Sequence, residues 1–206
     1  MTIKNIVFDM GNVLLAYTPE EYVKKIIADP EAAQAVLKEL FHGPEWTELD
    51  AGTITEEQAI LQVQARIPRF AESVQHAMDL WHSDLTPMPG MPEIVDGLKA
   101  RHYKVFLLSN TSLRFLKYYR KVEMFRKLDG FVISAQEKLM KPDPAIYRCL
   151  CSRYNLLPQE CLFVDDLQNN VDGAVACGWS GHRFAGAEEL RHFLEKKQIL
   201  ALGATV

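Results

Sequence analysis

The sequence predicts an α/β protein, a doubly wound parallel sheet with a small helical domain inserted after its first strand. Two observations support this fold class. Short apolar runs that end in polar residues alternate with helical patterns over most of the chain, as in sheets covered on both faces. Residues 17–86 instead contain helical patterns and no convincing strand, so this block is predicted to be an all-helical insertion.

The first strand is predicted at residues 6–8, an apolar run that ends abruptly at Asp9. An ionised carboxylate at the end of a buried strand is unfavourable unless a cation or a set of hydrogen-bond donors meets it. Gly11 and Asn12 follow directly, and both residue types allow a sharp turn. Ligands of open α/β sheets bind beyond the carboxyl ends of the strands, which makes Asp9 a candidate site residue.

The helical insertion is predicted to contain helices at about residues 19–29, 31–42, 55–66 and 70–84. Thr18 and Thr55 each precede a helical pattern and have Glu21 or Gln58 three residues later, which predicts two capping boxes. Residues 42–52 lack a helical period, and their aromatic and charged side chains suit a surface that contacts another molecule.

The prolines at 87, 89 and 92 mark the return to the sheet domain, which is therefore assigned residues 1–16 and 87–206. Further strands are predicted at 104–108, 130–133, 161–164 and 180–184. Helices are predicted at about 91–101, 112–122 and 187–197, with two more after Asp143 and around Asn170. Asp143 is expected to cap its helix, with Pro144 at the first helical position.

The bulk composition is that of an ordinary globular protein, with 206 residues, 48% hydrophobic residues and a net charge of −4. The sequence has no excess of basic residues, which argues against nucleic-acid binding, and no apolar run is long enough to span a membrane. The first residues enter a strand without the pattern of a signal peptide, so we expect a cytoplasmic protein. The four cysteines are expected to be reduced, structural thiols.

Polar residues end three of the predicted strands, and in a parallel sheet these ends meet in one crevice. They are Asp9, the pair Ser109 and Asn110, and the pair Asp165 and Asp166. Clustered carboxylates call for a cation, and an all-oxygen ligand set with room for waters suits Mg²⁺. Ser109 and the later Lys141 add a hydroxyl donor and a positive charge for a phosphate group. Together these groups predict phosphoryl transfer through an aspartyl-phosphate.

The sequence resembles the haloacid dehalogenase-like (HAD) hydrolases, whose four motifs occur here in order. They are FDMGNV around Asp9, LLSN ending at Ser109 and Asn110, KPD beginning at Lys141, and FVDD at residues 163–166 followed by Asn170 and Gly173. The resemblance covers nearly the whole chain, because the helical insertion is similar to the first-position cap of that family. It implies a Rossmann-like sheet and a cap that closes over the crevice.

The resemblance also implies roles for individual residues. Asp9 would be the nucleophile, and Mg²⁺ would be held by Asp9, Asp166 and the backbone carbonyl of Gly11, with Asp165 as a direct or water-mediated ligand. The phosphoryl oxygens would be bound by Ser109, Asn110 and Lys141, and by Gly11 and Asn12 in the turn after the nucleophile.

One departure concerns acid–base catalysis. Most phosphatases of this family carry a second aspartate two residues after the nucleophile, and here that position is Gly11. A D-x-G-N-V motif resembles the branch of sugar phosphatases that act on glucose 1-phosphate, whose anomeric leaving group needs less help from an acid. In decreasing order of preference, Asp165, His42 or Glu48 is expected to replace the missing base.

The sequence therefore predicts a Mg²⁺-dependent phosphomonoesterase that acts on a small phosphorylated metabolite, most plausibly a sugar phosphate. The alternatives are a dehalogenase that uses the same nucleophile, a phosphomutase, and a non-catalytic or regulatory module, for which Gly11 is the best evidence. His42, Trp46 and Glu48 are candidate substrate contacts in the cap, although packing or loop roles are favoured for them. The sequence does not indicate the oligomeric state.

Overall fold

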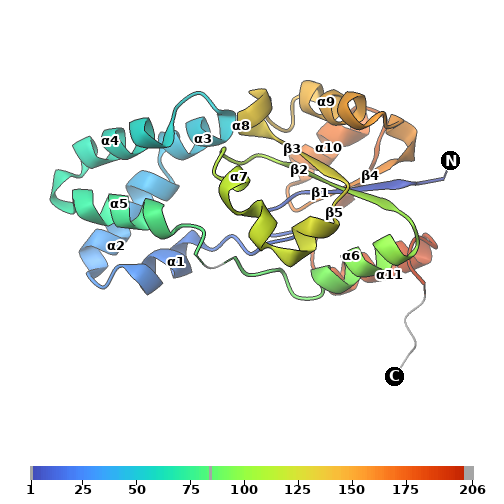
Figure 1. The fold of residues 1–206 in the computed structure, drawn as a ribbon, viewed down its shortest axis with the longest axis horizontal. Coiled ribbons are helices and arrows are strands. Elements are labelled where there is room, and N and C mark those ends of the chain that lie inside the picture. Colours follow the sequence, from blue (N-terminus) through green and yellow to red (C-terminus); the bar gives the residue numbers. More distant parts are fainter. Residues whose placement is uncertain (1, 84, 202–206) are drawn as a thin grey trace.

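A computed structural model describes residues 2–83 and 85–201 of the chain. Its centre is a five-stranded parallel sheet in the order β3-β2-β1-β4-β5 (Figure 1). The strands are β1 (Asn5–Phe8), β2 (Lys104–Ser109), β3 (Gly130–Ile133), β4 (Cys161–Asp165) and β5 (Ser180–Arg183). All five predicted strands and the doubly wound topology are thus confirmed.

The helices fall into two groups (Figure 1). Helices α1 to α5 lie in the helical insertion, and α6 to α11 accompany the sheet. The α-helices are α1 (Pro19–Ile26), α2 (Pro30–Val36), α3 (Pro44–Ala51), α4 (Glu56–Arg66), α5 (Ala71–Leu80), α6 (Met91–Ala100), α7 (Phe115–Tyr118), α8 (Ser134–Glu137), α9 (Pro144–Tyr154), α10 (Gln168–Ala176) and α11 (Ala187–Lys196). A π-helical turn, Leu37–Phe41, continues α2, and a 3₁₀ turn, Tyr119–Lys121, continues α7.

Local capping signals explain several helix starts. Thr55 forms the predicted capping box with Gln58, in which each side chain bonds the other's backbone N–H at 3.2 and 2.9 Å. Asp143 accepts a bond from the Ala145 N–H at 2.7 Å and caps α9 as predicted. Thr18 does stand at the N-cap of α1 with Pro19 at the first helical position, but the capping box predicted with Glu21 is wrong, because the Thr18 side chain makes no capping bond.

The stretch at residues 42–52, which shows no helical period, contains helix α3. This helix is short, and it carries apolar side chains on more than one side because it packs on both the insertion and the sheet domain. It ends at Gly52, whose φ of +68° is in the left-handed region that favours glycine. A Cβ atom at Gly52 would lie 2.2 Å from the Ala135 carbonyl oxygen, so the backbones of the two domains approach closely here.

Alternate residues of β1 pack into two cores on opposite faces of the sheet. Ile6 and Phe8 belong to the core beneath α6 and α11, whereas Val7 belongs to the core beneath α9 and α10. Figure 1 shows these two helix pairs on opposite sides of the sheet. The carboxyl ends of the strands are covered by neither helix pair and point toward the helical insertion.

The helical insertion has a hydrophobic core of its own, formed by residues such as Val36, Leu40 and Met78. Both of its connections to the sheet domain run side by side. The Ala16 N–H donates to the Thr86 carbonyl at 2.9 Å, and the Met88 N–H donates to the Leu14 carbonyl at 2.9 Å. We propose on these grounds that the insertion, residues 17–86, is a separate cap domain, with residues 1–16 and 87–206 as the core domain.

Two smaller predictions concern the rest of the chain. The four cysteines are free thiols, as expected. Among the described residues, no helix combines the length and the apolar character needed to cross a bilayer.

Candidate active site

The ends of the central strands bring the sequence-predicted residues together. Phe8 lies in register with Leu107 of β2 and Val164 of β4, so Asp9 follows β1 directly beside Asp165. The Asp9 N–H donates to the Val164 carbonyl at 2.9 Å, which fixes the start of the turn. The register therefore places both carboxylates at the carboxyl edge of the sheet.

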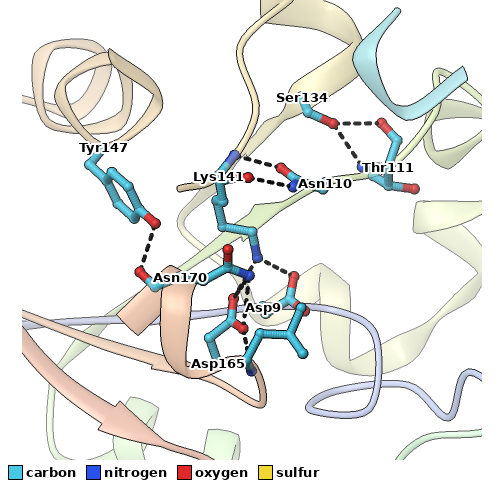
Figure 2. Close-up of polar contacts among 9 residues, drawn as sticks. Asp9, Asn110, Thr111, Ser134, Lys141, Tyr147, Asp165 and Asn170 are labelled. Atoms are coloured by element: carbon cyan, nitrogen blue, oxygen red, sulfur yellow. Dashed lines mark hydrogen bonds and ion pairs between the residues drawn. The ribbon is translucent and has the colours of Figure 1, made fainter. Parts of the chain in front are cut away.

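Lys141 connects the two carboxylates (Figure 2). Its Nζ lies 2.7 Å from Asp9 Oδ1 and 2.6 Å from Asp165 Oδ2. All three side chains are buried. Burial alone would lower the pKa of Lys141, but the charges of Asp9 and Asp165 outweigh it and raise that pKa, so the ammonium stays charged.

Two asparagines hold this group in place (Figure 2). The Asn110 amide bonds the backbone of Lys141 in both directions, donating to its carbonyl at 3.0 Å and accepting from its N–H at 2.8 Å. Asn170 Nδ2 donates to both oxygens of Asp165, at 3.0 and 3.1 Å. The side chain of Asn110 thus positions Lys141, and Asn110 also lines the cavity.

Gly173 explains how closely the Lys141 loop approaches α10. A Cβ atom there would lie 2.8 Å from the Pro142 carbonyl oxygen and 2.9 Å from the Tyr147 hydroxyl. That hydroxyl donates to the Asn170 carbonyl at 2.7 Å. Glycine in a helix interior is unfavourable by about 1 kcal/mol relative to alanine, so its presence is explained by this contact.

The carboxylates fit a divalent cation. Asp9, Asp165 and Asp166 each offer an oxygen, and these three atoms lie within 4.8 Å of one another. Asp165 is fully buried and already bonded to Lys141 and Asn170, whereas Asp166 is partly exposed to the cavity. Burial, and then the Asp165 charge, raise the pKa of Asp166, which a bound cation would oppose. The all-oxygen donor set suits Mg²⁺.

A cavity of about 330 Å³ opens above these residues and is closed on its far side by the helical insertion. Asp9, Gly11, Ser109 and Lys141 line its floor, and the Ser109 side chain is buried there. A Cβ atom at Gly11 would make only an ordinary contact, 3.8 Å from Tyr17 Cβ. Lack of space therefore does not explain why this position is a glycine.

Aromatic side chains of the helical insertion form the far wall of the cavity, which we call the aromatic wall: Tyr17, Tyr22, Trp46, Trp81 and His82. Trp81 is in ring contact with Tyr17, Tyr22 and Trp46, at centroid separations of 5.6, 4.8 and 5.2 Å. Apart from Trp46, sequence reasoning did not single these out, since they are distant along the chain.

Of the three cap candidates from the sequence, Trp46 alone lines the cavity. His42 is exposed and lies 3.4 Å from Glu20, and Glu48 is exposed on the outer side of α3. His82 also lines the cavity and stacks on Tyr118 at a centroid separation of 4.0 Å. Burial and the nearby Arg114 lower the pKa of His82 to about 3, so it is neutral at physiological pH.

Asp50 is the residue that sequence reasoning missed most clearly. It lies on α3, inside the stretch predicted to be non-helical, and it lines the same cavity as Asp9. The signal available in the sequence was one acidic residue just before the helix-ending Gly52.

The structure thus combines a Rossmann-like parallel sheet with an aspartate, a lysine and further carboxylates at the carboxyl edge of that sheet. The family model described as haloacid dehalogenase-like hydrolase matches residues 3–178, and the chain belongs to that family. The resemblance noted from the four motifs is thereby confirmed at the level of the superfamily.

Relatives and solved structures agree with this assignment. A sesquiterpene phosphatase, astK, from Aspergillus oryzae is 25% identical over 97% of both chains. A phosphorylated carbohydrates phosphatase from Thermotoga maritima is 27% identical over 57% of this chain and 56% of its own length. A HAD family enzyme from Bacteroides thetaiotaomicron, solved with magnesium and inorganic phosphate, is 25% identical, with a TM-score of 0.68 over 93% of this chain and 98% of its own. A predicted HAD-like hydrolase from Porphyromonas gingivalis has a TM-score of 0.72 over 94% and 98% of the two chains.

Proposed function

We propose that this hydrolase is a Mg²⁺-dependent phosphomonoesterase that forms an aspartyl-phosphate on Asp9. The observation that carries the proposal is the buried contact of Lys141 with Asp9 and Asp165 at the floor of a cavity. A lysine held there by two buried carboxylates provides a fixed positive charge for a phosphoryl group at the floor of the cavity.

In the proposed reaction, an Asp9 oxygen attacks the phosphorus atom and the bond to the leaving oxygen breaks. Water then hydrolyses the acyl phosphate and restores Asp9. Lys141 and the Ser109 hydroxyl would bind the phosphoryl oxygens, while Asn110 and Asn170 keep the lysine and Asp165 in position. Asp9, Asp166 and the Gly11 carbonyl would hold Mg²⁺, with Asp165 as a direct or water-mediated ligand, and the bound ion would neutralise phosphate charge.

The substrate class we propose is a small phosphorylated metabolite, with a sugar phosphate first. The named activity of the Thermotoga relative, and rings that can stack on the apolar face of a sugar, support this choice. A prenyl monophosphate is the second candidate, because the aromatic wall offers apolar contact area and the Aspergillus relative is named a sesquiterpene phosphatase. The cytoplasmic location predicted from the sequence stays a prediction.

A phosphate-release screen over sugar phosphates, prenyl monophosphates, nucleotides and phosphoacids tests the function. We expect Mg²⁺-dependent phosphate release that a chelator abolishes. Asp9→Asn should lower the rate of release by about 10³-fold or more, because the nucleophile is lost. Chelator-resistant activity on a 2-haloacid would instead identify a dehalogenase. Equal, background-level release by wild type and Asp9→Asn would identify a non-catalytic module.

A further inference from the structure

The proposed reaction needs a proton for the leaving oxygen and a base for the attacking water, and Gly11 can supply neither. Asp165, the first candidate from the sequence, is fully buried, and its oxygens are bonded to Lys141, Asn170 and the Leu167 N–H. His42 and Glu48 lie outside the cavity, and His82 is neutral with a strongly lowered pKa. The acid–base group must therefore be sought elsewhere on the cavity wall.

Asp50 is the one carboxylate that the helical insertion contributes to the described lining of the cavity. Asp50 and Asp9 line the same cavity, and the two are close enough for their charges to interact. A phosphate ester attacked by Asp9 has to place its leaving group in this cavity, because Asp9 opens onto no other described space. An acid for the leaving oxygen is therefore required on the lining of this cavity.

Contacts with the core domain hold Asp50 in place. Its carboxylate accepts a hydrogen bond from the Ser112 N–H, in the loop that follows β2. Its carbonyl accepts a hydrogen bond from the Ser134 hydroxyl, which also accepts from the Thr111 N–H at 2.8 Å (Figure 2 shows Ser134 and Thr111). With Gly52 pressed against Ala135, these bonds fix the end of α3 on the segments that follow β2 and β3, of which β2 ends at Ser109.

The surroundings of Asp50 favour its protonated form. No ion pair joins it to a cation within the described part of the chain, and the titratable groups that face it are Asp9, Tyr17 and Tyr118. Burial is the main cause that raises the pKa of Asp50 to about 8; the Ser112 N–H opposes the shift and the Asp9 charge adds to it. Burial raises the pKa of both tyrosines as well, which leaves Asp50 as the group that can exchange a proton near neutrality.

We propose that Asp50 is the general acid and base of this enzyme, supplied by the cap in place of the aspartate that Gly11 replaces. This inference rests on the proposed function. While the Asp9 oxygen bonds to phosphorus and the ester P–O bond breaks, Asp50 gives its proton to the leaving oxygen. Asp50 then takes a proton from water as the water oxygen bonds to phosphorus and the Asp9–phosphorus link breaks, which restores both carboxyl groups.

The test compares wild type, Asp50→Asn and Glu72→Gln in single turnovers with Mg²⁺. Glu72 is an exposed carboxylate of the same insertion, away from the cavity, and serves as the matched control. The probes are 4-nitrophenyl phosphate, whose leaving group needs no acid, and phenyl phosphate, whose leaving group does. We expect Asp50→Asn to lose less than about threefold with the first and about 100-fold or more with the second, while Glu72→Gln matches wild type. In multiple turnovers, Asp50→Asn should release one equivalent of 4-nitrophenol rapidly and then slow down, because the water has lost its base.

Equal losses on both probes, or wild-type rates on both, would overturn the role of Asp50. A second measurement on wild type needs no variant: its rate with phenyl phosphate should fall above about pH 8 relative to its rate with 4-nitrophenyl phosphate, and a constant ratio would also overturn the role. If wild type and Asp9→Asn are both inactive, the proposed function fails and the inference with it. If turnover depends on Asp9 but not on Asp50, only the inference fails.

Discussion

Replacing Lys141 by methionine removes the positive charge between Asp9 and Asp165 with little change in side-chain length. The ammonium lies 2.7 and 2.6 Å from the two carboxylates, and the lysine is only 5% exposed. Removing one partner of a buried ion pair costs about 3–5 kcal/mol, because a charge stays buried without compensation. Since two carboxylates lose their partner here, we expect the free energy of unfolding at neutral pH to fall by an amount near the upper end of that range.

The loss should depend on pH with a definite sign. Without Lys141, only the hydrogen bond from the Met10 backbone opposes the burial and the Asp165 charge that raise the pKa of Asp9, so the folded variant binds protons more readily than its unfolded chain. Stability gained in this way is present below the unfolded pKa and is lost as pH rises. The deficit relative to wild type should therefore be largest at neutral pH and shrink toward about pH 4. Saturating Mg²⁺ places positive charge at the same carboxylates and should recover part of the lost stability.

Urea unfolding followed by circular dichroism measures these differences. Lys4→Met is the matched control: Lys4 lies 2.6 Å from Glu160, the same separation, but its side chain is 62% exposed. An exposed pair of this kind contributes less than about 1 kcal/mol. Equal losses for the two variants, or a deficit that grows as pH falls, would refute the electrostatic account of Lys141.

Other predictions follow from single contacts. Gly52→Ala should lower the thermal midpoint of unfolding by more than Gly178→Ala. Both glycines have positive φ, but of the two only Gly52 would place its added Cβ against backbone, at 2.2 Å. Equal shifts of the midpoint would contradict the close approach of the backbones at Gly52. Thr55→Ala should cost about 1 kcal/mol in urea unfolding, whereas Thr18→Ala should stay within about 0.5 kcal/mol, and the reverse order would contradict the cap assignment. Asp166→Asn should weaken Mg²⁺ binding at least tenfold (roughly) in isothermal titration calorimetry, and an unchanged affinity would remove Asp166 from the metal site.

The floor of the site could be predicted from sequence because its signals are local. A buried strand that ends in a carboxylate, as at Asp9 and Asp165, marks its own position at the sheet edge, and parallel pairing then brings the ends together. Lys141 comes from a loop, and the KPD motif identified it through the family resemblance. None of these required knowledge of which helices pack together.

The far wall could not be predicted in this way. Trp81 and Tyr17 meet only because the helical insertion folds back on itself, and no short-range pattern encodes that contact. Asp50 was overlooked because α3 packs on two domains, and a helix with apolar residues on more than one side has no clear amphipathic period. Thr18 shows the opposite failure, since a capping-box pattern was present and the bond did not form.

Gly173 has a consequence for how such a molecule can diversify. Because Gly173 has no side chain, the loop that carries Lys141 packs directly on helix α10. One added methyl group at Gly173 would push the loop and the helix apart and would move Lys141 relative to Asp9. The aromatic wall belongs to the helical insertion and takes no part in this contact, so exchanging its rings leaves the Lys141 loop in place. Substitutions in the aromatic wall can thus change which phosphate ester is bound without changing how Asp9 attacks the phosphorus atom.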